Sequence, residues 1–300
     1  MASLKGHKVT FMKKLLVIGA SGLLGSKAIE LRKEHYEAYG TYAKNEREGL
    51  YKLDVSDRTA VFSFIEEIRP DIVLDTHGLN NVDYGESHQE EVWKVNVEGS
   101  KTVAEASQRV GAKYIFISSD YVFSGTKSIY TEKDKPDPVN YVGRAKWATE
   151  SLLEVLGIDY IAARTSGLYG RVSSTGKKSF VQFIVENVQK GVKTEVINDQ
   201  YSSPTLVDDL ARSLFALAEA NATGVFNIVG RDCITKYEFA KAICKEFKLD
   251  ESLITPCSTA SISQAAKRPI KVKMSTRKLK QLIKQAPVGV KKGLKIIREG

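Results

Sequence analysis

Short strand-like runs alternate with amphipathic segments through the first half of the chain. Apolar and β-branched residues gather in runs at 13–19, 36–42, 71–75, 113–117 and 160–164. Between these runs, apolar residues recur at helical spacing, which predicts helices at 23–33, 58–68, 86–110 and 140–156. Strands that alternate with helices are typical of right-handed βαβ units. We therefore expect a parallel sheet that is covered on both faces.

In the second half of the chain, strands and helices alternate less regularly. A Gly/Ser/Thr-rich segment at 166–178 predicts a loop, and strands are expected at 194–197 and 225–229. Helices are expected at 179–190, 207–219, 235–247, 275–284 and 290–298, and Thr235 and Glu238 have the spacing of a capping box. The expected fold is α/β, with a Rossmann-type doubly wound parallel sheet at 12–165 to which about 194–230 returns. Segments 166–193 and 231–300 would form a smaller C-terminal substrate lobe.

Composition narrows the class of protein. Hydrophobic residues make up 42% and charged residues 27% of the 300 residues, as in ordinary globular proteins. No apolar run approaches the ~18 residues of a membrane span, and the first residues lack the apolar core of a secretion signal. Three cysteines without CxxC spacing predict neither a disulfide framework nor a zinc site. We expect a cytoplasmic protein with no metal site and no membrane segment.

The net charge of +9 is unevenly distributed. Residues 267–300 hold twelve Lys/Arg and one acid, whereas the remainder of the chain sums to −2. This basic segment is typical of a solvated helix face, although it could also attract a polyanionic substrate or a nucleic acid. No aromatic residue interrupts it, so a stacking platform for single strands is missing and we expect no nucleic-acid partner.

A glycine-rich turn follows the first strand directly. It has GxxGxxG spacing and opens a predicted helix, whose free N–H groups and positive dipole end suit a pyrophosphate. This position is that of the dinucleotide-binding fingerprint, in which glycine permits a tight turn and a close approach of the phosphate. Contacts to the cofactor are expected from Gly19, Ser21, Gly22, Leu23, Leu24 and Gly25.

The end of the second strand bears on the choice of cofactor. An acid at this point would hold the ribose hydroxyls of NAD(H), but the chain has Ala43, Lys44 and Asn45, followed by Arg47. Cations suit a 2′-phosphate, so NADP(H) is favoured over NAD(H), which stays the alternative cofactor; a solvated loop is the other interpretation. Asp54 and Val55, after a further short strand, are expected to border the adenine.

Four motifs follow in order along the chain. They are SSDYVFSG from Ser118, RTSGLYG from Arg164, VINDQYSSPT from Val196 and KRP from Lys267. Together they resemble the extended short-chain dehydrogenase/reductase family, and most of all its dTDP-4-dehydrorhamnose reductase branch, from residue 12 to about 297. They are also similar to the regulatory beta subunit of methionine adenosyltransferase, a relative that binds NADP and assists another enzyme.

The resemblance implies roles for three residues. Ser119 would hold the substrate oxygen, a tyrosine would donate the proton, and Lys146 would bind the nicotinamide ribose and lower the tyrosine pKa. The tyrosine position, four residues before Lys146, holds Val142, and Tyr141 is displaced by about 100° around an ideal helix. Tyr141 could reach the site through local helix distortion, another acid or water could serve, or the chain could bind cofactor with little chemistry.

The resemblance also places residues around the ligands. Thr76, His77, Gly78 and Ser118 would lie beside the nicotinamide, where His77 either supplies a proton or is a hydrogen-bonded packing residue. The implied substrate is a nucleotide-linked 4-keto sugar. It would be surrounded by Asp120, Tyr121, Gln200, Tyr201 and Arg268. Arg268 would pair with its diphosphate or cover an apolar surface with its stem.

Two functions follow from these observations. The first is an NADPH-dependent oxidoreductase that reduces a nucleotide-linked 4-keto sugar, as in dTDP-rhamnose biosynthesis. The alternative, motivated by Val142, is a catalytically weak NADP-binding regulatory subunit, with a homodimer or a partner enzyme as the assembly. A sugar epimerase or dehydratase is less well supported, because those relatives use an Asp/Glu pair after the serine position.

Overall fold

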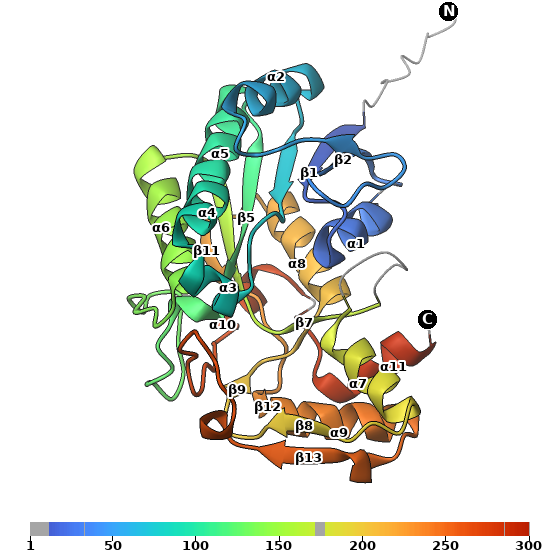
Figure 1. Ribbon diagram of the computed structural model, residues 1–300. Coiled ribbons are helices and arrows are strands. Elements are labelled where there is room, and N and C mark those ends of the chain that lie inside the picture. Colours follow the sequence, from blue (N-terminus) through green and yellow to red (C-terminus); the bar gives the residue numbers. More distant parts are fainter. Residues whose placement is uncertain (1–11, 33, 172–177, 285, 300) are drawn as a thin grey trace, which may run out of the picture.

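A seven-stranded parallel sheet forms the centre of the larger lobe (Figure 1). The computed structural model describes residues 12–32, 34–171, 178–284 and 286–299. The strand order is β11-β6-β5-β4-β1-β2-β3, which contains the 3-2-1-4-5-6 order of a Rossmann fold. The strands are β1 (Lys13–Ile18), β2 (Tyr36–Tyr42), β3 (Tyr51–Lys52), β4 (Ile72–Asp75), β5 (Lys113–Ser119), β6 (Tyr160–Thr165) and β11 (Gly224–Asn227). The predicted doubly wound parallel sheet is confirmed.

Alternate residues of each strand enter the two cores of this lobe. Leu15 and Val17 face α1 (Leu23–Arg32), α8 (Val207–Glu219) and α10 (Arg277–Leu282), whereas Leu16 and Ile18 face the opposite helices. The opposite face is covered by α2 (Arg58–Ile68), α5 (Ser100–Arg109) and α6 (Tyr141–Leu156). Apolar residues on both faces explain why β1 reads as a continuous apolar run.

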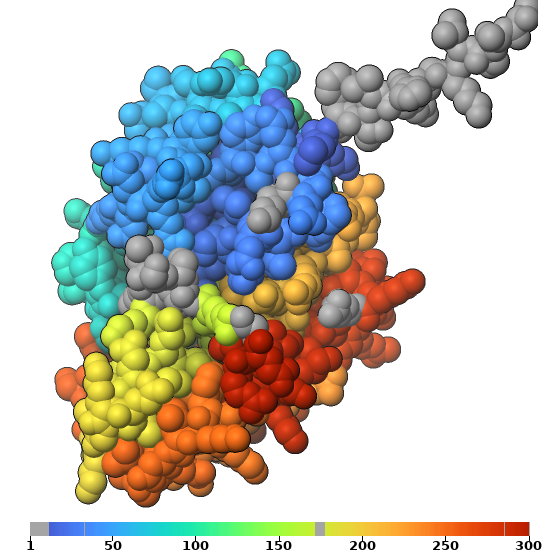
Figure 2. Space-filling view, turned by 90° about the vertical axis from the view of Figure 1, so that its right-hand side faces the viewer, coloured from blue at the N-terminus to red at the C-terminus, as the bar shows by residue number. Residues whose placement is uncertain are grey.

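A smaller lobe packs below the carboxyl ends of the strands. Its core joins α7 (Phe180–Gln189), α9 (Lys236–Phe247), α11 (Val290–Glu299), β8 (Thr194–Ile197) and β13 (Ile254–Cys257). In Figure 2, α11 (dark red) lies on this lobe close to α9 (orange). Val290, Leu294 and Ile297 are buried in that core, while the lysines of α11 are exposed.

Two expectations about the chain path need correction. The predicted helix at 86–110 begins earlier and is interrupted. It comprises α3 (Val82–Ser87), α4 (Gln89–Trp93), a π-helical turn η1 (Lys94–Gly99) and α5. Asn81 starts α3 because its side chain accepts from the Asp83 and Tyr84 N–H groups, and the backbone leaves helical geometry at His88. Of the segment 194–230, α8 packs on the large sheet and β11 joins it, whereas β8 pairs with β13 outside it.

Very short strands were missed. β7 (Leu168–Tyr169), inside the expected loop 166–178, pairs with β10 (Thr205–Leu206), and β9 (Tyr201–Ser202) pairs with β12 (Ile234–Thr235). Two residues give no periodic pattern, so only tertiary contacts reveal such strands. Residues 172–177 of that expected loop lie outside the described ranges. Within the described ranges, no helix combines the length and the apolar character needed to cross a membrane.

Candidate active-site cleft

A cleft of about 640 Å³ lies between the carboxyl ends of the large sheet and the small lobe. This is where open α/β sheets bind ligands. Most of the predicted site residues line it: Ser21, Gly22, Leu23, Leu24, Asn45, Thr76, His77, Gly78, Ser118, Ser119, Asp120, Tyr121, Lys146, Gln200, Tyr201 and Arg268. The structure does not bring the remaining predicted residues to the lining: Gly19, Gly25, Ala43, Lys44, Asp54, Val55 and Tyr141.

The three glycines of the opening turn have different positions. Gly19 has a φ of +78° and forms the tight turn. Gly22 lines the cleft at the start of α1, and a Cβ there would meet only the Gly19 carbonyl oxygen, at 3.3 Å. A Cβ on Gly25 would lie 2.6 Å from that same oxygen, so Gly25 serves close packing of helix on strand. This division of roles is that of a dinucleotide-binding turn.

In the loop after β2, the cation that lines the cleft is Arg47, whereas Lys44 lies outside the lining. The Lys44 side chain is exposed and lies 3.9 Å from Glu91, away from the cleft lining. Arg47 lines the cleft beside Asn45, and its Nε is buried with no hydrogen-bond partner in the part of the chain described. A buried guanidinium nitrogen without a partner in a cleft suits an anionic ligand.

Lys146 lies at the floor of the cleft. Asn140 caps α6 by accepting from the Gly143 N–H at 2.8 Å, and Lys146 follows on the buried side of the helix. Its Nζ donates to the Ile117 carbonyl oxygen at 2.8 Å. Burial lowers the pKa of Lys146 to about 8, although Asp75 and Glu150 oppose that shift. The ammonium is therefore held in place, and the folded protein binds its proton less tightly than a solvated lysine does.

Val142, at the position where the resemblance implies a tyrosine, has an apolar side chain. Val142 lines the cleft, whereas Tyr141 packs against the apolar cluster around Val82 and Val92. The Tyr141 N–H donates to Glu86 Oε1 at 2.8 Å, which fixes the start of α6 in regular geometry. A local distortion that would carry Tyr141 into the cleft is therefore not found.

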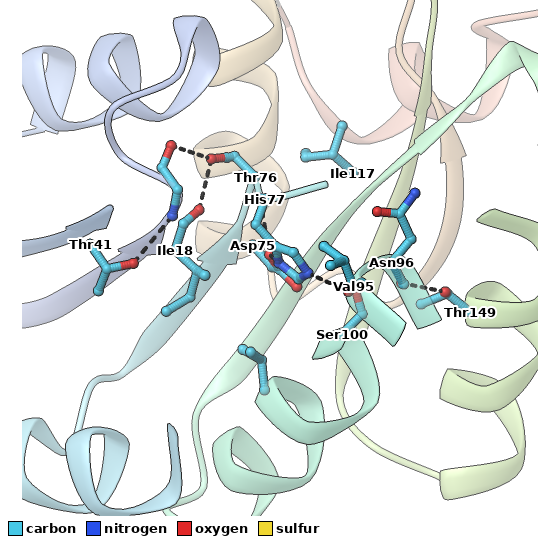
Figure 3. A network of polar contacts seen from close by, with 12 residues as sticks. Ile18, Thr41, Asp75, Thr76, His77, Val95, Asn96, Ser100, Ile117 and Thr149 are labelled. Atoms are coloured by element: carbon cyan, nitrogen blue, oxygen red, sulfur yellow. Dashed lines mark hydrogen bonds and ion pairs between the residues drawn. The ribbon is translucent and has the colours of Figure 1, made fainter. Parts of the chain in front are cut away.

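A buried polar network joins the turn, β4 and η1 (Figure 3). His77 Nδ1 contacts Asp75 Oδ1, and His77 Nε2 donates to the Val95 carbonyl oxygen at 2.9 Å. Burial opposes charge on both groups, but their contact outweighs it, so the pKa of His77 is raised and the pKa of Asp75 is lowered. Both ring nitrogens are engaged, which favours the packing interpretation of His77 over a free proton donor.

The π-helical turn positions further groups around Gly78. Asn96 holds the backbone of Leu79 from both sides, with Oδ1 accepting at 2.7 Å and Nδ2 donating at 3.0 Å. Thr149 of α6 donates to the Asn96 carbonyl oxygen at 3.0 Å. A Cβ on Gly78 would lie 3.5 Å from Lys146 Nζ. This network therefore connects the strand end to the helix that carries Lys146.

On the small-lobe side of the cleft, polar side chains are largely paired with other residues of the chain. Arg268 forms an ion pair with Asp83 and donates to the Ala266 carbonyl oxygen at 3.0 Å. Gln200 donates to Thr259 and Gln264. Arg268 therefore lines the cleft as a paired cation.

Sequence reasoning missed several cleft residues. Thr165, Lys178, Phe180 and Lys236 line the cleft, and the Thr165 hydroxyl is buried without a partner among the described residues. Burial lowers the pKa of Lys236. The capping box at Thr235 predicted where α9 begins, but only the docking of the small lobe shows that this helix start faces the cleft. No group of three or more His, Cys, Asp or Glu side chains suited to a metal ion occurs within the described ranges.

Comparisons with known proteins agree with this geometry. Over 301 residues the chain is 30% identical to dTDP-4-dehydrorhamnose reductase of Aggregatibacter actinomycetemcomitans, covering 96% of this chain and 99% of that protein. It is also 30% identical over 277 residues to methionine adenosyltransferase 2 subunit beta of Bos taurus. That match covers 90% of this chain and 82% of that protein.

A solved relative has the same fold. The crystal structure of dTDP-4-dehydrorhamnose reductase from Bacillus anthracis, in complex with NADP, matches with a TM-score of 0.88 and 29% identity, covering 96% of this chain and 99% of that chain. The predicted resemblance is confirmed. Residues 12–298 match the family model described as RmlD substrate binding domain, and the chain belongs to this family.

Proposed function

We propose that the protein is an NADPH-dependent reductase of a nucleotide-linked 4-keto sugar, similar to dTDP-4-dehydrorhamnose reductase. The observation that carries the proposal is the composition of one cleft. Gly22 at the opening turn, Arg47, Lys146 and Ser119 all line it, although they come from four separate segments. The family relationship and the NADP complex of the Bacillus anthracis relative support the same function.

The residues present fit a phosphorylated dinucleotide. The N–H groups at the start of α1 suit a pyrophosphate, and glycine at position 22 leaves room for its close approach. Arg47 Nε, buried and without a partner in the described chain, suits a 2′-phosphate. We therefore assign the preference for NADP(H) to Arg47 rather than to Lys44.

The chain's own residues would hold the reacting atoms in place. A bound dihydronicotinamide would supply the hydride. Lys146 would hold the ribose hydroxyls with the N–H bonds left free by its contact to Ile117, and Ser119 would donate a hydrogen bond to the keto oxygen. Lys236 would bind the nucleotide diphosphate from the small lobe, joined by Lys178 and Arg268, which also pair with Glu186 and Asp83.

A second candidate function rests on Val142. Valine has no proton to give at the position where the family places its acid, and Tyr141 lies outside the cleft lining. A chain that holds NADP without turning over a sugar would act as a regulatory subunit of another enzyme. One relative is named as a subunit, methionine adenosyltransferase 2 subunit beta, which agrees with a place in a larger assembly. The cofactor side of the cleft would be the same in both functions.

Oxidation of NADPH in the presence of dTDP-4-keto-6-deoxy-L-mannose separates the two functions. We expect measurable turnover for the wild type, higher turnover for Val142→Tyr, and wild-type turnover for the control Tyr141→Phe, because Tyr141 packs outside the cleft. Absence of turnover in all three proteins, with NADP binding retained, would refute the reductase and support the regulatory subunit.

A further inference from the structure

A carboxyl group lies next to the residue that would hold the substrate oxygen. The Ser119 hydroxyl donates to Asp120 Oδ1 at 3.0 Å, and both residues line the cleft at the carboxyl end of β5. The Ser166 hydroxyl, after β6, donates to the other carboxyl oxygen, Oδ2. Asp120 has no cation among the contacts that the described chain makes to its carboxyl oxygens. It is an almost fully buried acid without a salt bridge, beside a reactive hydroxyl.

The geometry of this group directs a proton toward Ser119. Asp120 Oδ2 accepts from Ser166 and Oδ1 accepts from Ser119, so a proton added to Oδ1 would reverse the second hydrogen bond and face Ser119 Oγ. Ser119 Oγ also accepts from the Tyr121 N–H at 3.2 Å. With its two lone pairs taken by Tyr121 and by a protonated Asp120, the Ser119 hydroxyl proton is left to point at a ligand in the cleft.

We propose that Asp120 is the proton source of the reduction, acting through Ser119 in place of the missing tyrosine. This inference rests on the proposed reductase function. Burial raises the pKa of the Asp120 carboxyl, and ligands that fill the cleft would remove further water from around it.

The proton and electron balance of the step is simple. The keto carbon accepts a hydride from a dihydronicotinamide, and the carbon–oxygen π electrons move to the oxygen. That oxygen takes the Ser119 hydroxyl proton, and Ser119 Oγ takes the carboxyl proton from Asp120 Oδ1. The Asp120 carboxylate that remains is protonated again from solvent once the product alcohol leaves the cleft.

Other proton donors in the cleft are less well placed. Both ring nitrogens of His77 are engaged by Asp75 and Val95. Lys146 donates to the Ile117 carbonyl oxygen, and its remaining N–H bonds would hold the nicotinamide ribose. Burial raises the pKa of Tyr121 to about 12, and its ring packs on the apolar cluster around Val142.

Several titratable groups face Asp120 and would affect its pH dependence. Tyr121 lies on the same turn, Cys233 on the segment after β11, and Lys236 at the start of α9. Asp120→Asn keeps the size of the side chain and its contacts to both serines but removes the carboxyl proton. Tyr121→Phe tests the rival phenol.

The kinetic experiment compares Asp120→Asn in two backgrounds. In the wild type we expect kcat to fall by about 100-fold or more with little change in KM, as is usual for loss of an acid–base group. In Val142→Tyr the same change should lower kcat by less than about 5-fold, because the introduced phenol delivers the proton. Equal losses in the two backgrounds, or a larger loss in Tyr121→Phe than in Asp120→Asn, would overturn the proposal.

A spectroscopic measurement on the ligand-free protein is independent of turnover. Infrared titration should show a protonated-carboxyl band that persists above the pH at which exposed aspartates ionise. Burial also raises the pKa of Asp209, so the comparison is made in an Asp209→Asn background. There the band should disappear on Asp120→Asn and remain in the control Asp134→Asn, in which the pKa of the replaced carboxyl is lowered by Lys127 and Thr131. A band that Asp120→Asn leaves unchanged in that background, or no band before that change, would refute the relay. Absence of turnover in both the wild type and Val142→Tyr would instead refute the reductase function, and the relay with it.

Discussion

Replacement of Lys146 by methionine should stabilise the ligand-free protein. The ammonium is almost fully buried, and its pKa falls from 10.5 to about 8. A folded-state pKa below the unfolded one means that the folded state binds the proton less tightly. The buried charge therefore costs most below about pH 8, and the cost disappears as pH rises through the unfolded pKa. A difference of about 2.5 units corresponds to about 3 kcal/mol near neutral pH.

The lost hydrogen bond to Ile117 offsets part of this gain. It is worth about 1 kcal/mol, so Lys146→Met should raise the free energy of unfolding by about 2 kcal/mol near pH 7. Between about pH 7 and pH 9.5 the difference from wild type should shrink by about 2 kcal/mol, since the wild-type lysine loses its proton in that interval. Urea unfolding of both proteins at the two pH values measures this difference in the free energy of unfolding. The surface variant Lys190→Met is the control. A destabilised Lys146→Met protein, or a difference that does not depend on pH, would refute the reasoning.

Three further predictions test the turn, the loop cation and a helix cap. Gly25→Ala should lower the free energy of unfolding by about 1–3 kcal/mol, because the added Cβ would meet backbone atoms at 2.6 and 2.7 Å, whereas Gly22→Ala should fold normally but bind NADP more weakly. Equal stability of these two variants in urea would contradict this assignment. Arg47→Ala should reduce the ratio of NADPH affinity to NADH affinity by about 10-fold, and Lys44→Ala should change that ratio little. Fluorescence titrations measure both affinities. A larger loss in Lys44→Ala than in Arg47→Ala would restore the assignment of the 2′-phosphate contact to Lys44. Thr235→Ala should lower the free energy of unfolding by about 1 kcal/mol, because it removes the capping box of α9. An unchanged midpoint of thermal unfolding would show that the cap contributes nothing to stability.

The sequence was sufficient for the architecture of the larger lobe. Fully buried strands such as β4 read as continuous apolar runs, and the helices between the strands have strong periodicity. The predicted bounds 36–42, 58–68 and 207–219 match the structure residue for residue, although the strand at 36–42 is only partly buried. The π-helical turn escaped notice because one extra residue in a long helix hardly disturbs the apolar pattern. Two-residue strands carry no pattern at all.

The site was only partly predictable for a different reason. Residues at or just after the ends of large-sheet strands, such as Ser119 and Thr76, are placed by the strand order. Arg47 and Lys236 line the cleft because of how a loop closes and how the small lobe docks, and local spacing in the sequence predicts neither. Thr165 ends β6, so the strand order places it as well. The 100° displacement of Tyr141 did follow from helix geometry alone, because regular capping at Asn140 leaves α6 undistorted.

Titration calorimetry of the wild-type protein with NADP tests the central claim most directly. The arrangement of the opening turn, Arg47 and Lys146 around one cleft predicts saturable binding, tighter for NADP than for NAD and weakened in Gly22→Ala. No heat and no saturation at about millimolar concentrations of either dinucleotide would contradict the assignment of the cleft as a nucleotide site.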